Sequence, residues 1–221
     1  LEVYRNKLEI KNNKLVWNNP AKILDQSIIR DCFNPFNSSG GLKLVNGNIG
    51  KGIIKTSSLT EPDAEIVAPV SVFNDQEAVL EAFGTGRLNK DCIIVVRGQG
   101  PSANGMPELH KLTSPLNVLQ SKGYKVAIIT DGRMSGASGS VPAVIHITPE
   151  AKLGGTLAII QDGDIIKIDI INGVFNLLVE DDLLVKRTPM VFDDQPSGIG
   201  RELFKSFRTS VSSVETGASI F

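Results

Sequence analysis

The chain of 221 residues carries 23 basic and 24 acidic residues, which gives a formal net charge of -1. This balance, with no basic tract and no acidic tail, favours a small ligand over nucleic acid. The longest apolar runs, such as residues 93–96, are far shorter than the roughly 20 residues of a membrane-spanning helix. We therefore expect a cytoplasmic protein that binds neither nucleic acid nor a membrane.

Two cysteines, Cys32 and Cys92, are too few for a disulfide scaffold or for a zinc or iron–sulfur site built by this chain alone. Cys92 begins an apolar run, so we expect it in the core. Cys32 can be a reactive thiol, but we favour packing in the core or in a loop. The chain begins with Leu1 rather than Met, which suggests a piece of a longer protein.

In chain order, the first forty residues predict short strands and loops, with a turn at Asn12 and Asn13. Residues 42–58 predict two strands around a loop that carries Gly47, Gly50 and Gly52. Such a loop can cradle a ligand, but this one lacks the lysine and the helix of a P-loop. It is a weak phosphate motif.

Residues 64–73 predict a strand interrupted at Pro69, at a sheet edge or a bend. A helix follows, with Asn74 as its N-cap, Glu77 as the capping-box partner and Gly84 at its end. The apolar residues 92–96 then predict a buried strand.

A second helix is predicted from Ser114 as N-cap, with Pro115 in its first turn, to Gly123. Further strands are predicted at residues 126–130, 141–148 and 156–164. Residues 165–180 predict a hairpin with a type I′ turn at Asn172-Gly173. A last helical segment covers residues 201–207.

Many short strands with few helices between them argue against a doubly wound α/β domain. We predict a mainly β domain with flanking helices, an α+β fold around a barrel-like β core.

The stretch KVAIITDGRMSGASG, residues 125–139, combines a buried strand with a loop in which glycines surround Ser135 and Ser138. Glycines allow sharp turns and a close approach to a ligand. If strands 93–96 and 126–130 are parallel neighbours, the loops that follow them lie at one sheet edge. Ser135 and Glu108 then face one pocket.

Three functions are open at this point. Ser135 can be a hydrolase nucleophile with His110 or His146, although its surroundings do not match the G-x-S-x-G elbow. Ser135 can instead be a base that removes a proton, provided that a cation bound by Glu108 stabilises its alkoxide. The third function is ligand binding without catalysis.

Four stretches carry a resemblance: RGQGPSANGMPELHKL, KVAIITDGRMSGASGSVPAVIHITPEA, GGLKLVNGNIGKGIIKTSS and the tail TGASIF. Over essentially its whole length, the chain resembles the carboxyl-terminal part of the dihydroxy-acid and sugar-acid dehydratases. MPELHKLTSP and SGASGSVPA resemble the 6-phosphogluconate dehydratase branch. The alternative is a dehydratase of another dihydroxy or sugar acid.

The resemblance implies a swivelling β/β/α domain, covering residues 1–221, that docks on a larger amino-terminal domain absent from this chain. It implies a homodimeric 4Fe-4S enzyme of the Entner–Doudoroff pathway, which dehydrates 6-phospho-D-gluconate to 2-dehydro-3-deoxy-6-phospho-D-gluconate. Ser135 corresponds to the base that takes the C2 proton, and Glu108 to a ligand of Mg2+ or Mn2+. The cluster acts on the C3 hydroxyl.

The cluster ligands lie outside this chain, since neither cysteine matches them, so the isolated chain is expected to be inactive. The substrate phosphate needs hydroxyl or cationic partners. By composition, the candidates are Arg133, Ser138, Ser140 and Lys111.

Overall fold

The computed structural model describes residues 6–19, 23–37, 40–56, 59, 65–134, 140–192 and 198–221. The chain divides into two compact units, Leu1–Gly40 and Gly41–Phe221. Within the described residues, no helix combines the length and the apolar character that crossing a membrane requires.

The first unit contains a hairpin of two antiparallel strands, β1 (Lys7–Lys11) and β2 (Lys14–Asn18). Asn12 and Asn13 join them, and both have positive φ, 52° and 59°. A type I′ turn needs positive φ at both central residues, and asparagine tolerates this conformation better than most residues. The predicted turn is therefore confirmed.

The second unit is built on a closed barrel of eight strands in the order β10-β3-β4-β8-β7-β6-β5-β9. Strands β5, β6, β7 and β8 are parallel neighbours, and β10 closes the barrel by pairing with both β3 and β9. The strand bounds are β3 Leu42–Gly47, β4 Gly50–Lys55, β5 Glu65–Phe73, β6 Cys92–Val96, β7 Val126–Thr130, β8 Ala143–Thr148, β9 Ile165–Asp169 and β10 Val174–Leu177. The predicted barrel-like core is confirmed.

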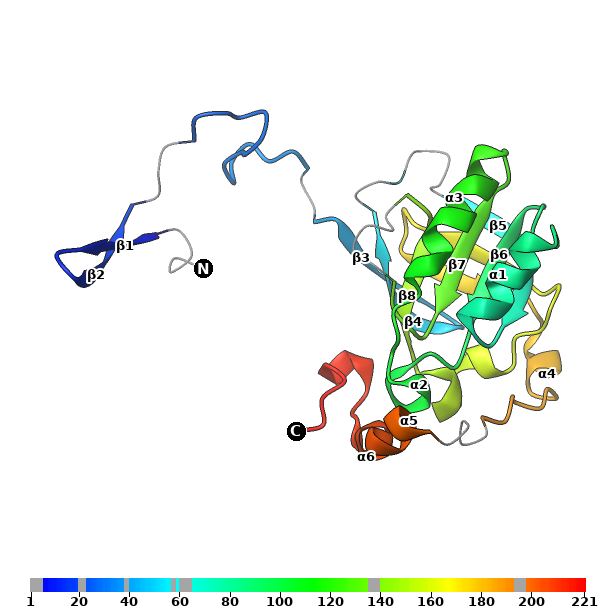
Figure 1. Ribbon diagram of the computed structural model, residues 1–221. Helices are drawn as coiled ribbons and strands as arrows, with labels where there is room; N and C mark the ends of the chain where they lie inside the picture. The colour runs from blue at the N-terminus through cyan, green and yellow to red at the C-terminus, as the bar shows by residue number, and fades with distance from the viewer. Residues whose placement is uncertain are drawn as a thin grey trace. The chain divides into compact units, whose positions relative to one another are not determined.

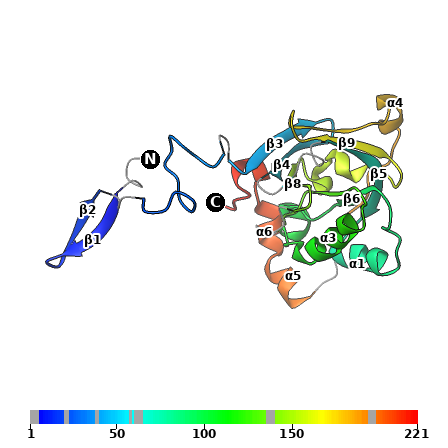
Figure 2. The same cartoon turned by 90° about the horizontal axis from the view of Figure 1, so that it is seen from above.

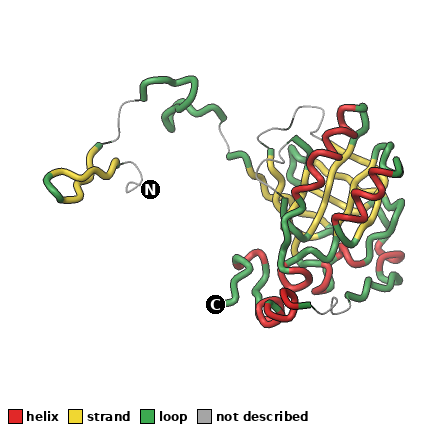
Figure 3. Tube along the Cα trace, viewed as in Figure 1, coloured by secondary structure: helices red, strands yellow, loops and turns green. Residues whose placement is uncertain are grey.

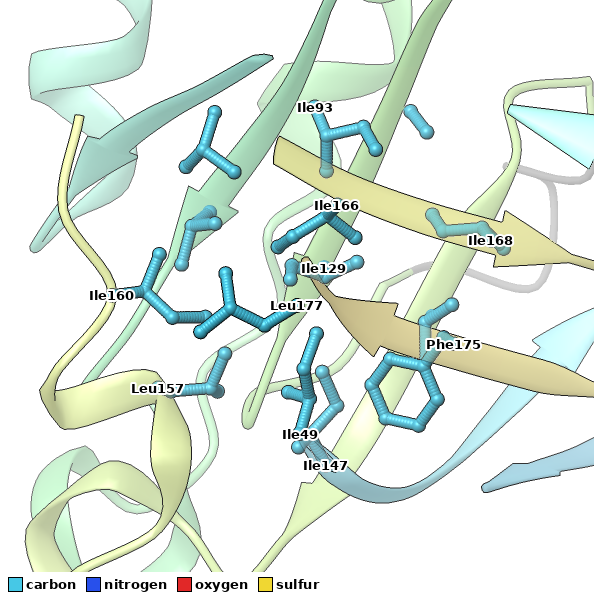
Figure 4. Close-up of a cluster of buried hydrophobic side chains, with 14 of the residues drawn as sticks. Ile49, Ile93, Ile129, Ile147, Leu157, Ile160, Ile166, Ile168, Phe175 and Leu177 are labelled. Atoms are coloured by element: carbon cyan, nitrogen blue, oxygen red, sulfur yellow. The ribbon is translucent and has the colours of Figure 1, made fainter. Parts of the chain in front are cut away.

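Alternate residues of the barrel strands supply two hydrophobic cores. Ile93 and Ile129 belong to the first, whose side chains converge from β6, β7, β9, β10 and the turns between strands (Figure 4). The intervening residues, such as Ile94 and Ile128, belong to the second, together with Leu116. Strands β6 and β7 are buried on both faces, which explains why they are apolar throughout.

Helices α1 (Gln76–Gly84) and α3 (Thr113–Ser121) lie on the outside of the barrel and cover β6 and β7 (Figures 1 and 2). They connect the parallel strands, as crossover helices do. The short helices are α2 Pro101–Asn104, α4 Asp181–Leu184, α5 Ile199–Leu203 and α6 Lys205–Ser210. They lie outside the strands (Figure 3), and 3₁₀ turns occur at His110–Leu112, Ala151–Leu153, Thr156–Ala158 and Val214–Thr216.

The predicted N-caps of the two long helices are wrong. Asp75 caps α1, since its carboxylate accepts from the Ala78 N–H at 2.8 Å. Asn74 is instead turned to the loop after β6, where its side-chain oxygen accepts from Arg97 Nε at 3.1 Å. Helix α3 begins at Thr113, directly after a 3₁₀ turn, rather than at a Ser114 cap. Its predicted end holds, with Gly123 at φ 90° just beyond it.

The predicted glycine loop at residues 47–52 is also wrong. Gly47, Gly50 and Gly52 lie within β3 and β4, and the turn between these strands is Asn48-Ile49. A Cβ at Gly47 would lie 1.7 Å from the Phe175 carbonyl oxygen. These glycines therefore permit close contacts between strands in the barrel.

The predicted type I′ turn of the late hairpin is a longer connection. Pairing of β9 with β10 ends at Asp169 and Val174. The Asp169 carboxylate accepts from both the backbone and the side chain of Asn172, at 2.9 and 2.8 Å, and stops the strand there. Gly173 keeps positive φ, at 69°.

Two further strand predictions need correction. Residues 156–164 form a 3₁₀ turn and a loop, in which the Asp164 carboxylate accepts from the Gln161 N–H at 2.8 Å. Strand β5 continues through Pro69 without interruption. At Pro69 the pairing partner changes, since β6 begins to pair at Val70.

Asn48 stabilises the closure of the barrel, where β3 and β10 share a single backbone pair. Its amide accepts from the Leu177 N–H at 2.7 Å and donates to the Leu177 carbonyl at 2.8 Å. Asn48→Ala leaves both groups of a buried strand unpaired. We expect a loss of about 1–3 kcal/mol in the free energy of unfolding, measured by urea denaturation of the chain.

The matched control is Asn89→Ala, because Asn89 is exposed and its side chain makes no hydrogen bond to the described residues. Equal stability of the two variants would contradict the role of Asn48.

Candidate active site

The loops that follow β6 and β7 lie side by side. Glu108 and Arg133 form an isolated parallel bridge, and the Leu109 N–H donates to the Arg133 carbonyl at 3.0 Å. The two strands are parallel neighbours in register from Cys92 with Val126 to Val96 with Thr130. The expectation that their exit loops share one edge is thereby confirmed.

Asp131 ties these loops together from the end of β7. Its buried carboxylate accepts from three backbone N–H groups: Gln99 at 2.8 Å, Ala151 at 2.9 Å and Gly98 at 3.2 Å. Burial raises the pKa of Asp131, and the backbone donors oppose that shift. Because the donors come from the loops after β6 and β8, one side chain positions the ends of three strands.

A second buried carboxylate, Glu150, holds the same loop. It accepts from the N–H groups of Ser102 and Ala103, both at 3.0 Å, in the first turn of α2. A Cβ at position 100 would lie 2.2 Å from a Glu150 carboxylate oxygen, so this contact requires Gly100. Carboxylates suit the unpaired N–H groups at the start of a helix.

Sequence reasoning did not assign roles to Asp131 and Glu150. The signal for both is an acidic residue at the end of a strand: Asp131 follows its strand directly, and Glu150 follows after Pro149. Such a carboxylate reaches the edge where neighbouring loops begin, and it accepts hydrogen bonds that a buried backbone would otherwise lack.

Glu108 lies at this edge and is half-buried. Among the described residues, none donates a hydrogen bond or forms an ion pair with its carboxylate. A carboxylate without a protein partner suits a hard cation. The described part of the chain contains no group of three or more His, Cys, Asp or Glu side chains that can hold a metal ion. Glu108 is therefore at most one ligand of a larger set.

Each predicted phosphate partner that the structure describes has a partner within the chain. Arg133 stays beside the Glu108 loop, where its Nε donates to the Met106 carbonyl at 3.0 Å. Lys111 forms an ion pair with Glu77 of α1 at 2.7 Å, and Ser140 donates to Asn117 of α3 at 2.8 Å.

Ser135 and Ser138 lie outside the described residues, so their predicted roles stay predictions. Ser135 follows Arg133 by two positions in the chain.

His110 and His146, the two possible partners of a nucleophilic serine, lie in different settings. His110 is exposed in a 3₁₀ turn. The backbone N–H of His146 donates to the Gly132 carbonyl at 2.9 Å. Burial, together with the charge of Arg133, lowers the pKa of the His146 imidazole. This shift favours the neutral form of the imidazole.

The environment of Cys92 does not suit an iron–sulfur ligand. Cys92 is buried in the second core, and burial raises the pKa of its thiol to about 11. A cluster ligand must be a thiolate, which this environment disfavours. Cys32 is exposed, so the expectation that packing accounts for it is wrong, and it belongs to the other unit of the chain.

Comparison with known families identifies the chain. Residues 27–218 match the family described as "Dihydroxy-acid/6-phosphogluconate dehydratase C-terminal". The chain belongs to this family. It is 49% identical to a phosphogluconate dehydratase of Rhizobium meliloti over all of its own length, and 47% identical to one of Pseudomonas aeruginosa over 96% of its length.

A dihydroxy-acid dehydratase of Acetivibrio thermocellus is 36% identical over 76% of the chain. The chain spans only 37% of the Rhizobium relative and 35% of the Pseudomonas relative. The dehydratase-family resemblance read from the sequence is confirmed, and the matched region is the carboxyl-terminal part of a longer protein.

Asp131→Asn tests whether this carboxylate organises the site. Both carboxylate oxygens of Asp131 accept hydrogen bonds from backbone N–H groups. In the variant an NH2 group, which cannot accept, replaces one of these oxygens, so at least one hydrogen bond is lost. We expect unfolding to become easier by about 1–3 kcal/mol in a urea titration. Asp182→Asn on the exposed face of α4 is the control, and no difference between the two variants would refute the role of Asp131.

Proposed function

We propose that the whole protein dehydrates 6-phospho-D-gluconate to 2-dehydro-3-deoxy-6-phospho-D-gluconate and that this chain supplies the domain with the base. The observation that supports this most is the bridge between Glu108 and Arg133. It brings the residue that corresponds to the family's metal ligand next to the loop that leads to Ser135. The choice of 6-phosphogluconate as substrate rests on the relatives. The chain is more similar to the two phosphogluconate dehydratases than to the dihydroxy-acid dehydratase.

Ser135 takes the proton from C2 in this proposal. A serine hydroxyl is a very weak acid, so it serves as a base only where positive charge stabilises the alkoxide. Glu108 holds Mg2+ or Mn2+ through its carboxylate oxygen, which is the type of ligand that such cations prefer. When bound, the cation would make the C2 proton more acidic and would stabilise the alkoxide form of the hydroxyl, which is the form that accepts the proton.

The remaining residues of the site act by position. Asp131 and Glu150 hold the Glu108 loop at its distance from β7 by accepting backbone N–H groups. Small displacements of reacting groups cost large factors in rate, so this support matters for catalysis.

Groups outside this chain must complete the site. Neither cysteine of this chain matches the cluster ligands that the family resemblance implies, so we assign the ligands of the 4Fe-4S cluster, and the departure of the C3 hydroxyl, to the amino-terminal part. We assign the further metal ligands to that part as well, because the described residues of this chain contain no group of three or more His, Cys, Asp or Glu side chains that could hold the ion. Docking on that domain, a swivelling motion and a homodimer belong to the same proposal.

Ser135→Ala in the full-length protein tests the base. We expect kcat for 6-phosphogluconate to fall by about 10²–10⁴-fold, since general base catalysis contributes a factor of this size. Iron content and thermal stability should match the wild type. Ser121→Ala, at the exposed end of α3, is the control. A Ser135→Ala enzyme within tenfold of wild-type kcat would show that another group removes the proton.

Glu108→Gln tests the metal ligand. The amide is a neutral and weaker ligand, so we expect the Mg2+ concentration at half-maximal activity to rise by about tenfold or more. Glu81→Gln on the exposed face of α1 provides the comparison. An unchanged Mg2+ titration for Glu108→Gln would remove this residue from the ligand set.

A further inference from the structure

A pocket of about 570 Å³ lies between α2 and the carboxyl-terminal segment. Helix α2 contacts α6, and Figure 1 shows α5 and α6 beside α2 at one end of the barrel. Aromatic and aliphatic side chains form part of its wall, among them Phe204 and Phe207. Two arginines, Arg201 and Arg208, complete it.

The positive charge in this pocket has no carboxylate to balance it among the described residues that line it. Arg201 donates from Nη1 to the Asn104 side chain at 2.6 Å, and Arg208 donates from Nη2 to the Arg201 carbonyl at 2.9 Å. The buried Nε of Arg201 finds no acceptor in the described part of the chain. Burial and the neighbouring charge of Arg208 lower the pKa of Arg201. Two adjacent guanidinium groups without a carboxylate partner favour the binding of an anion in this pocket.

This pocket shares a wall with the candidate active site. Gly105 and Met106 line the pocket. Both belong to the loop after β6, which also carries Glu108, two residues after Met106. The Met106 carbonyl also accepts from Arg133 Nε, which ties the wall to the loop after β7. An elongated ligand can therefore place one end near Glu108 and the other near the arginine pair.

We propose that Arg201 and Arg208 bind the phosphate of the substrate. A phosphate monoester carries about -1.5 to -2 charges at pH 7, and guanidinium groups match its oxygen geometry. In 6-phosphogluconate the phosphate is at the opposite end of the carbon chain from C2 and C3, so it needs a site apart from Glu108. The ammonium of Lys111 already pairs with Glu77, whereas this arginine pair has no carboxylate partner in the described residues. The inference rests on the proposed function.

Arg208→Gln in the full-length protein tests the assignment. We expect KM for 6-phosphogluconate to rise by about tenfold or more, with a much smaller change in kcat, because a charged hydrogen bond is lost far from the reacting carbons. The preference for 6-phosphogluconate over gluconate in kcat/KM should fall by a similar factor. Arg208→Lys should recover part of the loss, and Arg87→Gln, exposed beyond the end of α1, should behave as wild type.

A titration with inorganic phosphate, followed by calorimetry, separates this proposal from the proposed function. We expect the wild type to bind phosphate and Arg208→Gln to bind it at least tenfold more weakly, with an unchanged melting temperature. If the wild type dehydrates 6-phosphogluconate but Arg208→Gln keeps its KM, the arginine pocket is refuted and the function stands. If the wild type dehydrates no phosphorylated sugar acid, the function falls, and equal phosphate binding by both proteins would refute the pocket too.

Discussion

The site depends on two buried carboxylates that accept backbone N–H groups. Burying a carboxylate is costly unless hydrogen bonds satisfy its oxygens, and Asp131 and Glu150 meet that condition with donors from the loops around them. Each of these hydrogen bonds fixes the position of a loop whose backbone does not pair in a β-sheet. The segment from Gly98 to Ala103 thus becomes a defined support for the residues that follow it.

The barrel explains why the functional residues meet at this edge. Strands β6 and β7 are parallel and buried on both faces, so the loops that follow them emerge together at one end. Helices α1 and α3 cover the outer face, which leaves the strand ends for the loops. Glu108 and Arg133 come from different loops and still form a backbone bridge. The short carboxyl-terminal helices then add the arginine pocket beside this edge.

The apolar runs predicted the strands of the barrel and the parallel pairing that joins the two loops, because burial on both faces leaves a strong pattern in the sequence. The positions of single turns and helix caps were harder to predict from the sequence. The Asp169 carboxylate accepts a hydrogen bond from Asn172 where its strand ends, and the Asn74 side chain accepts one from Arg97 instead of capping α1. The local sequence pattern does not reveal either contact. The role of Asp131 was missed for the same reason, since its three donors lie 20, 32 and 33 residues away in the chain.

The most direct test is a crystal structure of the full-length protein with Mn2+ and 6-phosphogluconate, with the metal located by anomalous scattering. We expect a Mn2+ peak within coordination distance of a Glu108 carboxylate oxygen and the Ser135 hydroxyl facing C2 of the ligand. A metal site whose ligands all come from outside this chain, with C2 far from Ser135, would contradict it.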